Sequence, residues 1–330
     1  MPNRSHFNAA HRMMNFIRKE GVTHSSDRVF VLPEKTHHAV IVSDAAELLR
    51  SVRDASVQLV VCDPPYNLDM ASWDRFNIYS NWASSWLDEV PRVLKDTGSL
   101  AIFGGFQFQN ERGGDLLDII SYLRKNGRLR LINVIVWHYR NGMSAHRFFA
   151  NRHEEIVWFA KSARYTFNLD EVRVPYDEET KKQYLRDPRL RPETIEKGKN
   201  PTNVWEIPRL NGNSAERVGH PTQKPVEVVR RLVKALSCPG DIVMDFFAGS
   251  GSTTRVCVEE GRHSIGSDAD PMWPDFLSRQ LAQLGALALT RYEILRGPTI
   301  SSHPVFQGIF QEEPVLPQAA TPAVHMAETR

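Results

Sequence analysis

The chain has 330 residues, of which 41% are hydrophobic and 24% are charged, and its formal net charge is +2. This length predicts one large catalytic domain with a smaller inserted region. We find no run of about 18 apolar residues that would span a membrane, and the N-terminus lacks the apolar core of a signal peptide. The three cysteines are widely spaced and form neither a metal-binding nor a disulfide pattern. These features favour the cytoplasm, and the weak net charge permits a nucleic-acid partner without indicating one.

Strands and helices alternate along the first half of the chain. Residues 1–36 are polar and basic and are expected to form an arm. Beyond them, apolar runs rich in β-branched residues predict strands at 39–42, 57–62, 98–104, 131–137 and 155–160. Helical spacing predicts helices at about 45–52, 78–95 and 115–126. This alternation is typical of a mostly parallel sheet with helices on both faces.

The composition of the sequence changes three times beyond residue 162. Residues 163–218 are polar, dotted with proline and weakly periodic, which by itself is typical of a solvated insertion. The strand and helix pattern then returns, with a helix over 225–236, a strand over 241–245, and a strand that ends at Asp268. From residue 297 the chain is rich in Pro, Ala, Gln and Thr, so we expect a disordered tail over 297–330.

A glycine loop connects the strand at 241–245 to the next helix. Its sequence is Phe246-Phe-Ala-Gly-Ser-Gly251, and Asp268 follows at the end of the next strand. Glycines let the backbone approach a ligand closely, and a carboxylate about 20 residues further on can hold ribose hydroxyls. The motif predicts a site for either a dinucleotide or S-adenosylmethionine (AdoMet). A simple glycine turn that closes a strand–helix corner is the structural alternative.

The sequence Asp63-Pro-Pro-Tyr66 stands at the carboxyl end of the strand at 57–62, where sites in open α/β sheets lie. An aromatic exocyclic amine is a poor nucleophile because its lone pair is delocalised into the ring. Two acceptors, the Asp63 carboxylate and the Pro64 carbonyl, can bind the amine hydrogens and localise that lone pair. Tyr66 can stack on a base that has been flipped out of a duplex. The structural alternative is an Asp-Pro turn after a strand.

Three motifs together carry a family resemblance: Asp63–Tyr66, the glycine loop, and His220-Pro-Thr-Gln-Lys-Pro225. They resemble the DNA amino-methyltransferases in the β arrangement, in which the catalytic motif precedes the AdoMet loop. The likeness is closest to adenine-N6 enzymes of the RsrI type, through segments 141–145, 147–155 and 200–205. It runs from about residue 3 to about residue 295.

The resemblance implies an AdoMet-dependent methyltransferase fold of the Rossmann-like α/β class, with a mostly parallel, seven-stranded sheet. Residues 37–162 would form the catalytic half and 219–296 the AdoMet-binding half. Residues 163–218 would be an inserted target-recognition region, and the arm at 1–36 a second DNA contact. The implied partners are double-stranded DNA and, functionally, a cognate restriction endonuclease. We also expect a homodimer contact on the helix at 78–95 through Trp82 and Trp86.

The implied catalytic residues are Asp63, Pro64, Pro65 and Tyr66. In the cofactor site, Asp268 would hold the ribose, Asp44 and Ala45 would face the adenine ring, and Phe247–Gly251 would lie beside the methionine moiety. His220, Thr222 and Lys224 would lie near the methionine carboxylate. The complete implied cofactor set is Asp44, Ala45, Asp63, His220, Pro221, Thr222, Lys224, Asp245, Phe246, Phe247, Ala248, Gly249, Ser250, Gly251, Ser252, Thr253, Asp268 and Ala269.

Each of these roles has a structural alternative. Asp44 could cap the following helix, and Lys224 could be an exposed charge at a helix start. We expect no metal, and His153-Glu154-Glu155 is no zinc motif because no second histidine follows at helical spacing. The cations that could contact phosphates from the target-recognition region are Lys181, Lys182, Arg186, Arg189, Arg191, Lys197 and Lys199. Acidic residues are almost as frequent there, so we expect many of these cations to pair locally.

The sequence therefore predicts a DNA methyltransferase specific for N6 of adenine. Asp at position 63 favours adenine, since cytosine-N4 enzymes with the same mechanism more often carry Ser there. Cytosine N4 is the near alternative. RNA bases and protein glutamines are usually methylated by sites with Asn in place of Asp63. A dehydrogenase would leave Asp63–Tyr66 unexplained, and a non-catalytic DNA-binding or regulatory protein would not need intact acceptors beside an intact cofactor loop.

Overall fold

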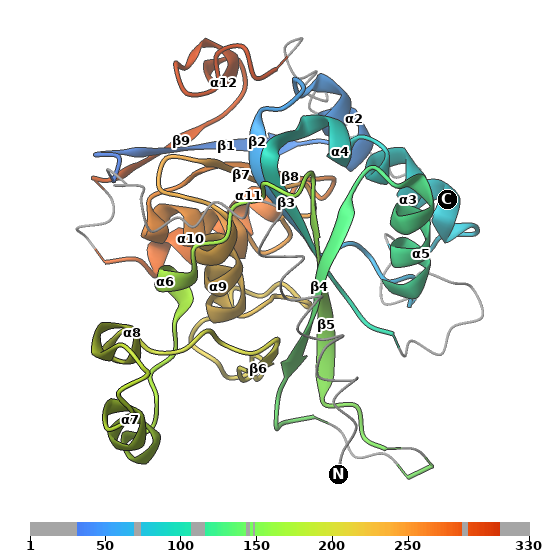
Figure 1. Cartoon of the computed structure of the whole chain (residues 1–330). Helices are drawn as coiled ribbons and strands as arrows, with labels where there is room; N and C mark the ends of the chain where they lie inside the picture. The colour runs from blue at the N-terminus through green and yellow to red at the C-terminus, as the bar shows by residue number, and fades with distance from the viewer. Residues whose placement is uncertain are drawn as a thin grey trace, which may run out of the picture.

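The computed structural model describes residues 32–68, 74–106, 116–142, 146–147, 149–285 and 290–310. Within these residues, nine strands form one sheet in the order β6-β4-β5-β3-β2-β7-β8-β1-β9 (Figure 1). The strands are β1 Thr36–Val42, β2 Val57–Cys62, β3 Leu94–Gly104, β4 Arg130–His138, β5 His153–Ala160, β6 Val204–Glu206, β7 Ile242–Asp245, β8 His263–Asp268 and β9 Tyr292–Leu295. All neighbours are parallel except that β5 is antiparallel to β3 and β4. The predicted mostly parallel α/β sheet is confirmed.

The expected number of strands was wrong. All seven predicted strands are present, in the consecutive order β4-β5-β3-β2-β7-β8-β1, and one more strand extends each edge. At one edge β6 pairs with β4, and at the other β9 pairs with β1. These edge strands have three and four residues. Segments this short do not display a strand period, which explains why the sequence pattern did not reveal them.

Helices cover both faces of the sheet (Figure 1). Their bounds are α2 Ala45–Ser51, α3 Tyr79–Leu87, α4 Val90–Val93, α5 Leu116–Asn126, α6 Leu169–Val172, α7 Glu178–Leu185, α8 Pro192–Glu196, α9 Val226–Leu236, α10 Ser252–Glu260, α11 Trp273–Ala282 and α12 Thr299–Ser302. Along β2, Val60 and Cys62 belong to the core with α2, α3 and α5, whereas Leu59 and Val61 belong to the core with α9 and α10. Because both faces of β2 are covered, the whole strand is buried and five of its six residues are apolar.

The helix predicted over 78–95 is two helices. α3 ends at Leu87, α4 carries a proline in its first turn, and Leu94 already begins β3. Trp86 is completely buried, and the ring of Trp82 stacks on Phe76 with centroids 4.1 Å apart. Trp86 therefore offers no surface for the expected homodimer contact, and the homodimer itself stays a prediction.

The tail expected from residue 297 begins with a folded segment. Residues 297–310 contain α12 and pack back on the domain, with Ile300 and Phe306 almost fully buried. The backbone of Arg53 donates a hydrogen bond to Ile309, and Val52 forms a bridge with Phe310. The composition suggested disorder, but three spaced apolar side chains (Ile300, Phe306 and Ile309) are enough to anchor this segment. The remainder of the expected tail, and residues 1–31 of the expected arm, lie outside the described residues.

The predicted target-recognition region, 163–218, contains α6, α7, α8 and β6. α7 and α8 project from the body of the molecule and lie at the lower left of Figure 1. Lys181 on α7 forms an ion pair with Glu196 on α8, with 2.6 Å between Nζ and Oε2. β6 returns the chain to the sheet edge beside β4. Among the described helices, none has the length and apolar character to cross a bilayer.

Candidate active site

Acidic residues lie at the carboxyl ends of four parallel strands. Asp245 and Asp268 end β7 and β8, Asp63 follows β2, and Asp44 lies two residues beyond β1. The chain leaves β2 towards α3 on one face, whereas it leaves the adjacent β7 towards α10 on the other face. Such a reversal opens a crevice at the carboxyl ends of the two strands. A cavity of about 520 Å³ lies there.

The cavity collects most of the residues predicted from the sequence. Every predicted catalytic and cofactor residue lines it except Pro221 and Gly251. Gly251 has φ +78°, and a Cβ at this position would lie 2.8 Å from Leu277 Cδ1, so its glycine allows α11 to pack against the loop. The sequence did not identify the other lining residues, which are Val61, Asp74, Phe76, Trp82, Phe103, Val229 and Asp270.

The glycine loop fixes the Asp268 carboxylate at the cavity wall. Gly249 N–H donates to Oδ2 at 2.8 Å, and Asp270 N–H donates to Oδ1 at 2.9 Å. Burial nevertheless raises the pKa of Asp268. Gly249 has φ +44°, and a Cβ there would lie 3.0 Å from the His220 ring. Glycine at this position therefore lets the loop lie against the His220 ring.

Asp245 is a second buried carboxylate on the cavity wall. The Thr253 hydroxyl donates to its Oδ2 at 2.6 Å, and the Phe247 N–H donates to its Oδ1 at 3.1 Å. Burial raises the pKa of Asp245 to about 7 in spite of these two donors, and the nearby Asp268 and Asp63 carboxylates add to the rise. Asp245 therefore changes its charge near neutral pH.

The Asp63–Tyr66 turn is held by hydrogen bonds. The Tyr66 hydroxyl donates to Asp63 Oδ1, and the hydroxyl of Tyr79 on α3 donates to the Pro65 carbonyl at 2.9 Å. Burial, followed by the Asp63 carboxylate, raises the pKa of Tyr66 well above its usual value, so the hydroxyl remains a donor. The turn that follows is clipped by Asp74, which accepts from the backbone N–H groups of Asn67 and Leu68.

Lys224 lines the cavity beside Asp63, and its implied place near the methionine carboxylate stays a prediction. Its Nζ is 3.0 Å from Asp63 Oδ2 and 3.2 Å from Glu154 Oε2, and it donates to the Tyr66 hydroxyl at 3.2 Å. Burial by itself lowers the pKa of Lys224, but the Asp63 and Glu154 carboxylates outweigh burial and raise it. The lysine therefore stays charged, and its place beside Asp63 also excludes the alternative of an exposed helix-start charge.

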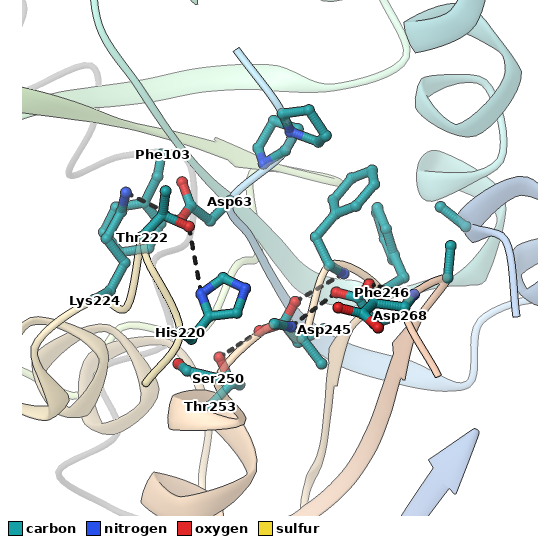
Figure 2. A pocket seen from close by; sticks show the side chains of 18 of the residues that line it. Asp63, Phe103, His220, Thr222, Lys224, Asp245, Phe246, Ser250, Thr253 and Asp268 are labelled. Carbon is teal, nitrogen blue, oxygen red and sulfur yellow. Dashed lines mark hydrogen bonds and ion pairs between the residues drawn. The ribbon is translucent and has the colours of Figure 1, made fainter. Parts of the chain in front are cut away.

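The segment His220–Pro225 forms one side of the cavity (Figure 2). Gln223 secures it, because its side chain accepts from Val218 N–H at 2.9 Å and donates to the Glu216 carbonyl at 2.8 Å. The Ser252 hydroxyl of α10 donates to the Lys224 carbonyl at 3.1 Å. Burial lowers the pKa of His220, so its imidazole is neutral at pH 7.

Asp44 caps the helix that follows it and also lines the cavity. It is the N-cap of α2, where its carboxylate accepts from Ala46 N–H at 2.8 Å and from Glu47 N–H at 3.3 Å. The nearby apolar wall consists of Phe76, Trp82 and Phe247, with 5.8 Å between the ring centroids of Trp82 and Phe247. This wall offers flat aromatic faces to a ligand.

One group of potential metal ligands exists among the described residues, and it lies near the amino-terminal ends of β1 and β9. His37 at the start of β1, Glu293 on β9 and His303 after α12 bring ligand atoms within 4.8 Å of one another. The His37 and His303 rings pack with centroids 4.1 Å apart, and Lys35 already binds Glu293 at 2.9 Å. These contacts describe ring packing and an ion pair, so the expectation of no metal stays a prediction.

The family model that matches the chain is described as DNA methylase (N6_N4_Mtase), and it covers residues 57–272. The chain belongs to this family of DNA methylases. It is 34% identical over 248 residues to the Type II methyltransferase M.HpaI of Haemophilus parainfluenzae, covering 73% of each chain. It is 32% identical over 235 residues to the DNA adenine methyltransferase YhdJ of Escherichia coli K12, covering 69% of this chain and 76% of YhdJ. The fold also matches TTHA0409 of Thermus thermophilus, solved with S-adenosyl-L-methionine, with TM-score 0.52, 25% identity, and coverage of 80% of this chain and 98% of that one.

Proposed function

We propose that this chain is a site-specific DNA methyltransferase of the β arrangement, which transfers a methyl group from AdoMet to N6 of adenine. One observation carries the proposal: the Asp63-Pro-Pro-Tyr turn and the glycine loop line the same cavity of about 520 Å³. A dehydrogenase would have no use for Asp63 beside its cofactor loop. Membership of the DNA methylase family supports both the reaction and the nucleic-acid substrate.

The residues of the cavity fit AdoMet. Gly249 allows close approach of the loop, because a Cβ there would meet the His220 ring at 3.0 Å. The Asp268 carboxylate is fixed at the end of β8, where it can accept from ribose hydroxyls. Asp44, Ala45 and the aromatic wall offer a surface for the adenine ring. The anionic carboxylates of the cavity suit a ligand with a net positive charge. When bound, AdoMet supplies an electrophilic methyl group.

The chain's own residues act on the target amine. The Asp63 carboxylate and the Pro64 carbonyl accept its two N–H groups and localise the nitrogen lone pair. The transfer is direct, with no covalent enzyme intermediate, and the Asp63 carboxylate can take the proton that the nitrogen then releases. Tyr66 stacks on the base, and its hydroxyl leaves Asp63 Oδ1 when the amine takes that position. Positioning and this stabilisation of developing charge supply most of the rate.

Two features favour adenine N6. Position 63 carries Asp, and a relative of 32% identity is named a DNA adenine methyltransferase. Cytosine N4 remains the near alternative, since the matching family model covers both reactions by name. A flipped-out base is required in either case, because the amine cannot be reached inside a duplex.

The region 163–218 is proposed to bind the DNA. The expected local pairing is found for three of its seven named cations: Lys181 pairs with Glu196, Arg189 with Asp187 and Lys197 with Asp170. Of the other four, Lys199 lies with its Nζ 5.6 Å from the Tyr176 ring centroid. Three are exposed and form no ion pair within the described part of the chain, namely Lys182, Arg186 and Arg191. They are the best candidates for phosphate contacts. The Type II names of relatives such as M.HpaI support a modification enzyme that works with a cognate restriction endonuclease.

The deciding experiment is methyl transfer from labelled AdoMet to unmethylated genomic DNA, followed by nucleoside analysis of the product. We expect the label in N6-methyladenine. Label in N4-methylcytosine would keep the mechanism and overturn the base. No label in DNA from a folded protein that binds AdoMet would overturn the proposed substrate.

A further inference from the structure

Glu154 on β5 is the second partner of the lysine that binds Asp63. The Lys224 ammonium lies between two carboxylates, 3.0 Å from Asp63 Oδ2 and 3.2 Å from Glu154 Oε2. The three side chains are 12%, 21% and 22% exposed for Lys224, Asp63 and Glu154, so solvent screens these contacts weakly. Glu154 does not line the cavity. The ion pair with Lys224 links Glu154 to Asp63.

The sheet places these groups together. Asp63 continues the alternation of Val61 on β2, and Glu154 continues the alternation of Ile156 on β5, so both point to the face covered by α9. β3 separates the two strands, and its Phe103 lies under the lysine, with Nζ 5.6 Å from the ring centroid. Lys224 thus crosses one intervening strand to reach both carboxylates.

The charge of this cluster depends on Glu154. One ammonium and two carboxylates sum to −1, whereas Asp63 and Lys224 without Glu154 would form a neutral pair. A carboxylate committed to a single buried ammonium is a weaker acceptor for a third group, and an ammonium shared with a second carboxylate draws on it less. In the proposed reaction the Tyr66 hydroxyl gives up Asp63 Oδ1 to the amine, so the orientation of Asp63 then depends on Lys224 holding Oδ2.

We propose that Glu154 is a positioning residue for methyl transfer, which shares Lys224 with Asp63 and thereby keeps Asp63 oriented and available to the target amine. This inference rests on the proposed function. It assigns a role to one residue of the His153–Glu155 segment, which is no zinc motif. Its neighbours take a different part, because His153 pairs with Glu155 at 3.0 Å and Glu155 accepts from Phe106 N–H.

The test compares steady-state kinetics of Glu154→Gln, which keeps the shape and removes the charge, with those of the wild type. We expect kcat to fall about 10- to 100-fold, the loss typical of a displaced catalytic group, with KM for AdoMet within about threefold. Glu154→Asp keeps the charge and should recover part of kcat. The matched control is Glu227→Gln, which removes a glutamate–arginine pair to Arg230 on α9 outside the cavity and should leave kcat within about twofold.

A double-mutant cycle separates positioning from a purely structural role. If Glu154 acts through Lys224, Glu154→Gln should change kcat less than about threefold when added to Lys224→Met. A full effect of Glu154→Gln in that background would overturn the inference. So would a kcat within about twofold of the wild type for the folded single variant, or a loss of AdoMet affinity equal to the loss in kcat.

The wild-type reaction distinguishes the two levels of the argument. If the wild type methylates DNA and Glu154→Gln does so equally well, the role of Glu154 is wrong and the proposed function stands. If the wild type binds AdoMet but transfers no methyl group to DNA, the proposed function fails and the inference fails with it.

Discussion

The buried carboxylate of Asp245 should make AdoMet binding depend on pH. Its pKa is raised to about 7, chiefly by burial, while Thr253 and the Phe247 N–H oppose the rise. A ligand of net positive charge in the same cavity binds better when Asp245 is ionised. Acidification protonates the Asp245 carboxylate of the ligand-free protein and should therefore weaken AdoMet binding. Asp245→Asn keeps the side-chain shape and removes the charge.

The expected size follows from the fraction of protein in the ionised state. With a pKa of about 7, about 90% of Asp245 is ionised at pH 8 and about 10% at pH 6. The apparent Kd for AdoMet should therefore rise about tenfold between pH 8 and pH 6, equivalent to about 1.4 kcal/mol. In the ligand-free protein the raised pKa has the opposite consequence: its contribution to stability is present at low pH and is lost as the pH rises through 7.

Isothermal titration of AdoMet at pH 6, 7 and 8 measures the effect directly. Asp245→Asn should bind more weakly than the wild type at pH 8 and should lose most of the dependence on pH. The variant is needed because the raised pKa of Asp268 acts in the same direction. His220 contributes little above pH 6, since its pKa is lowered. A flat Kd in the wild type, or the same slope in the variant, would refute the reasoning.

Four further changes test other parts of the molecule. Asp63→Ala should reduce methyl transfer at least about 100-fold while AdoMet affinity, measured by titration, stays within about threefold; near-native turnover would contradict the mechanism. Gly249→Val should weaken AdoMet binding at least about tenfold, because φ is positive and the added side chain meets His220. The control is Gly212→Val, where a side chain would enter open space. Equal AdoMet affinity in the two folded variants would refute the placement of the loop. A triple variant replaces three unpaired cations with Gln, namely Lys182, Arg186 and Arg191. It should lower the slope of log K against log salt for DNA binding by about 2.7. A smaller change is expected when three locally paired cations are replaced, namely Lys181, Arg189 and Lys197, and an equal change in the two variants would argue against this surface. Phe306→Ala should lower the free energy of unfolding by about 3–5 kcal/mol in urea titration, since the ring is fully buried; a loss below about 1 kcal/mol would mean that the C-terminal segment does not stabilise the domain.

The core of the fold could be predicted because its strands are short apolar runs that stand out in the sequence. Five of the six residues of β2 are apolar, and the neighbouring β7 ends in a recognisable glycine loop. The errors occur where local composition and tertiary packing disagree. α12 and Phe306 lie in a stretch whose composition suggests disorder, and α4 with Pro91 interrupts a run with helical spacing. In the first case contacts distant in sequence decide the structure, whereas in the second the proline in the first turn of α4 marks the break.

The site was predicted best where backbone geometry restricts the residue type. Gly249 and Gly251 both have positive φ, and the proline pair at 64–65 fixes the turn that presents Asp63. The aromatic lining residues Phe76 and Trp82 carried no such signal, because helical spacing in that part of the chain also suits ordinary core residues. Family resemblance located the other cavity residues but not their partners.

Lys224 shows why a motif gives the place of a side chain more readily than its role. The sequence His-Pro-Thr-Gln-Lys-Pro predicts a lysine beside the cofactor loop, and the Ser252–Lys224 backbone contact agrees with that position. The ammonium lies several bonds from the backbone, and the two nearest carboxylates determine its direction. One of them, Glu154, is 70 residues earlier in the chain and comes from an antiparallel strand. Strand alternation could have placed Glu154 on the α9 face, but only the order β5-β3-β2 shows that the lysine can reach both carboxylates. The link between the two halves of the site is therefore a property of sheet order, and the double-mutant cycle on Glu154 and Lys224 measures it directly.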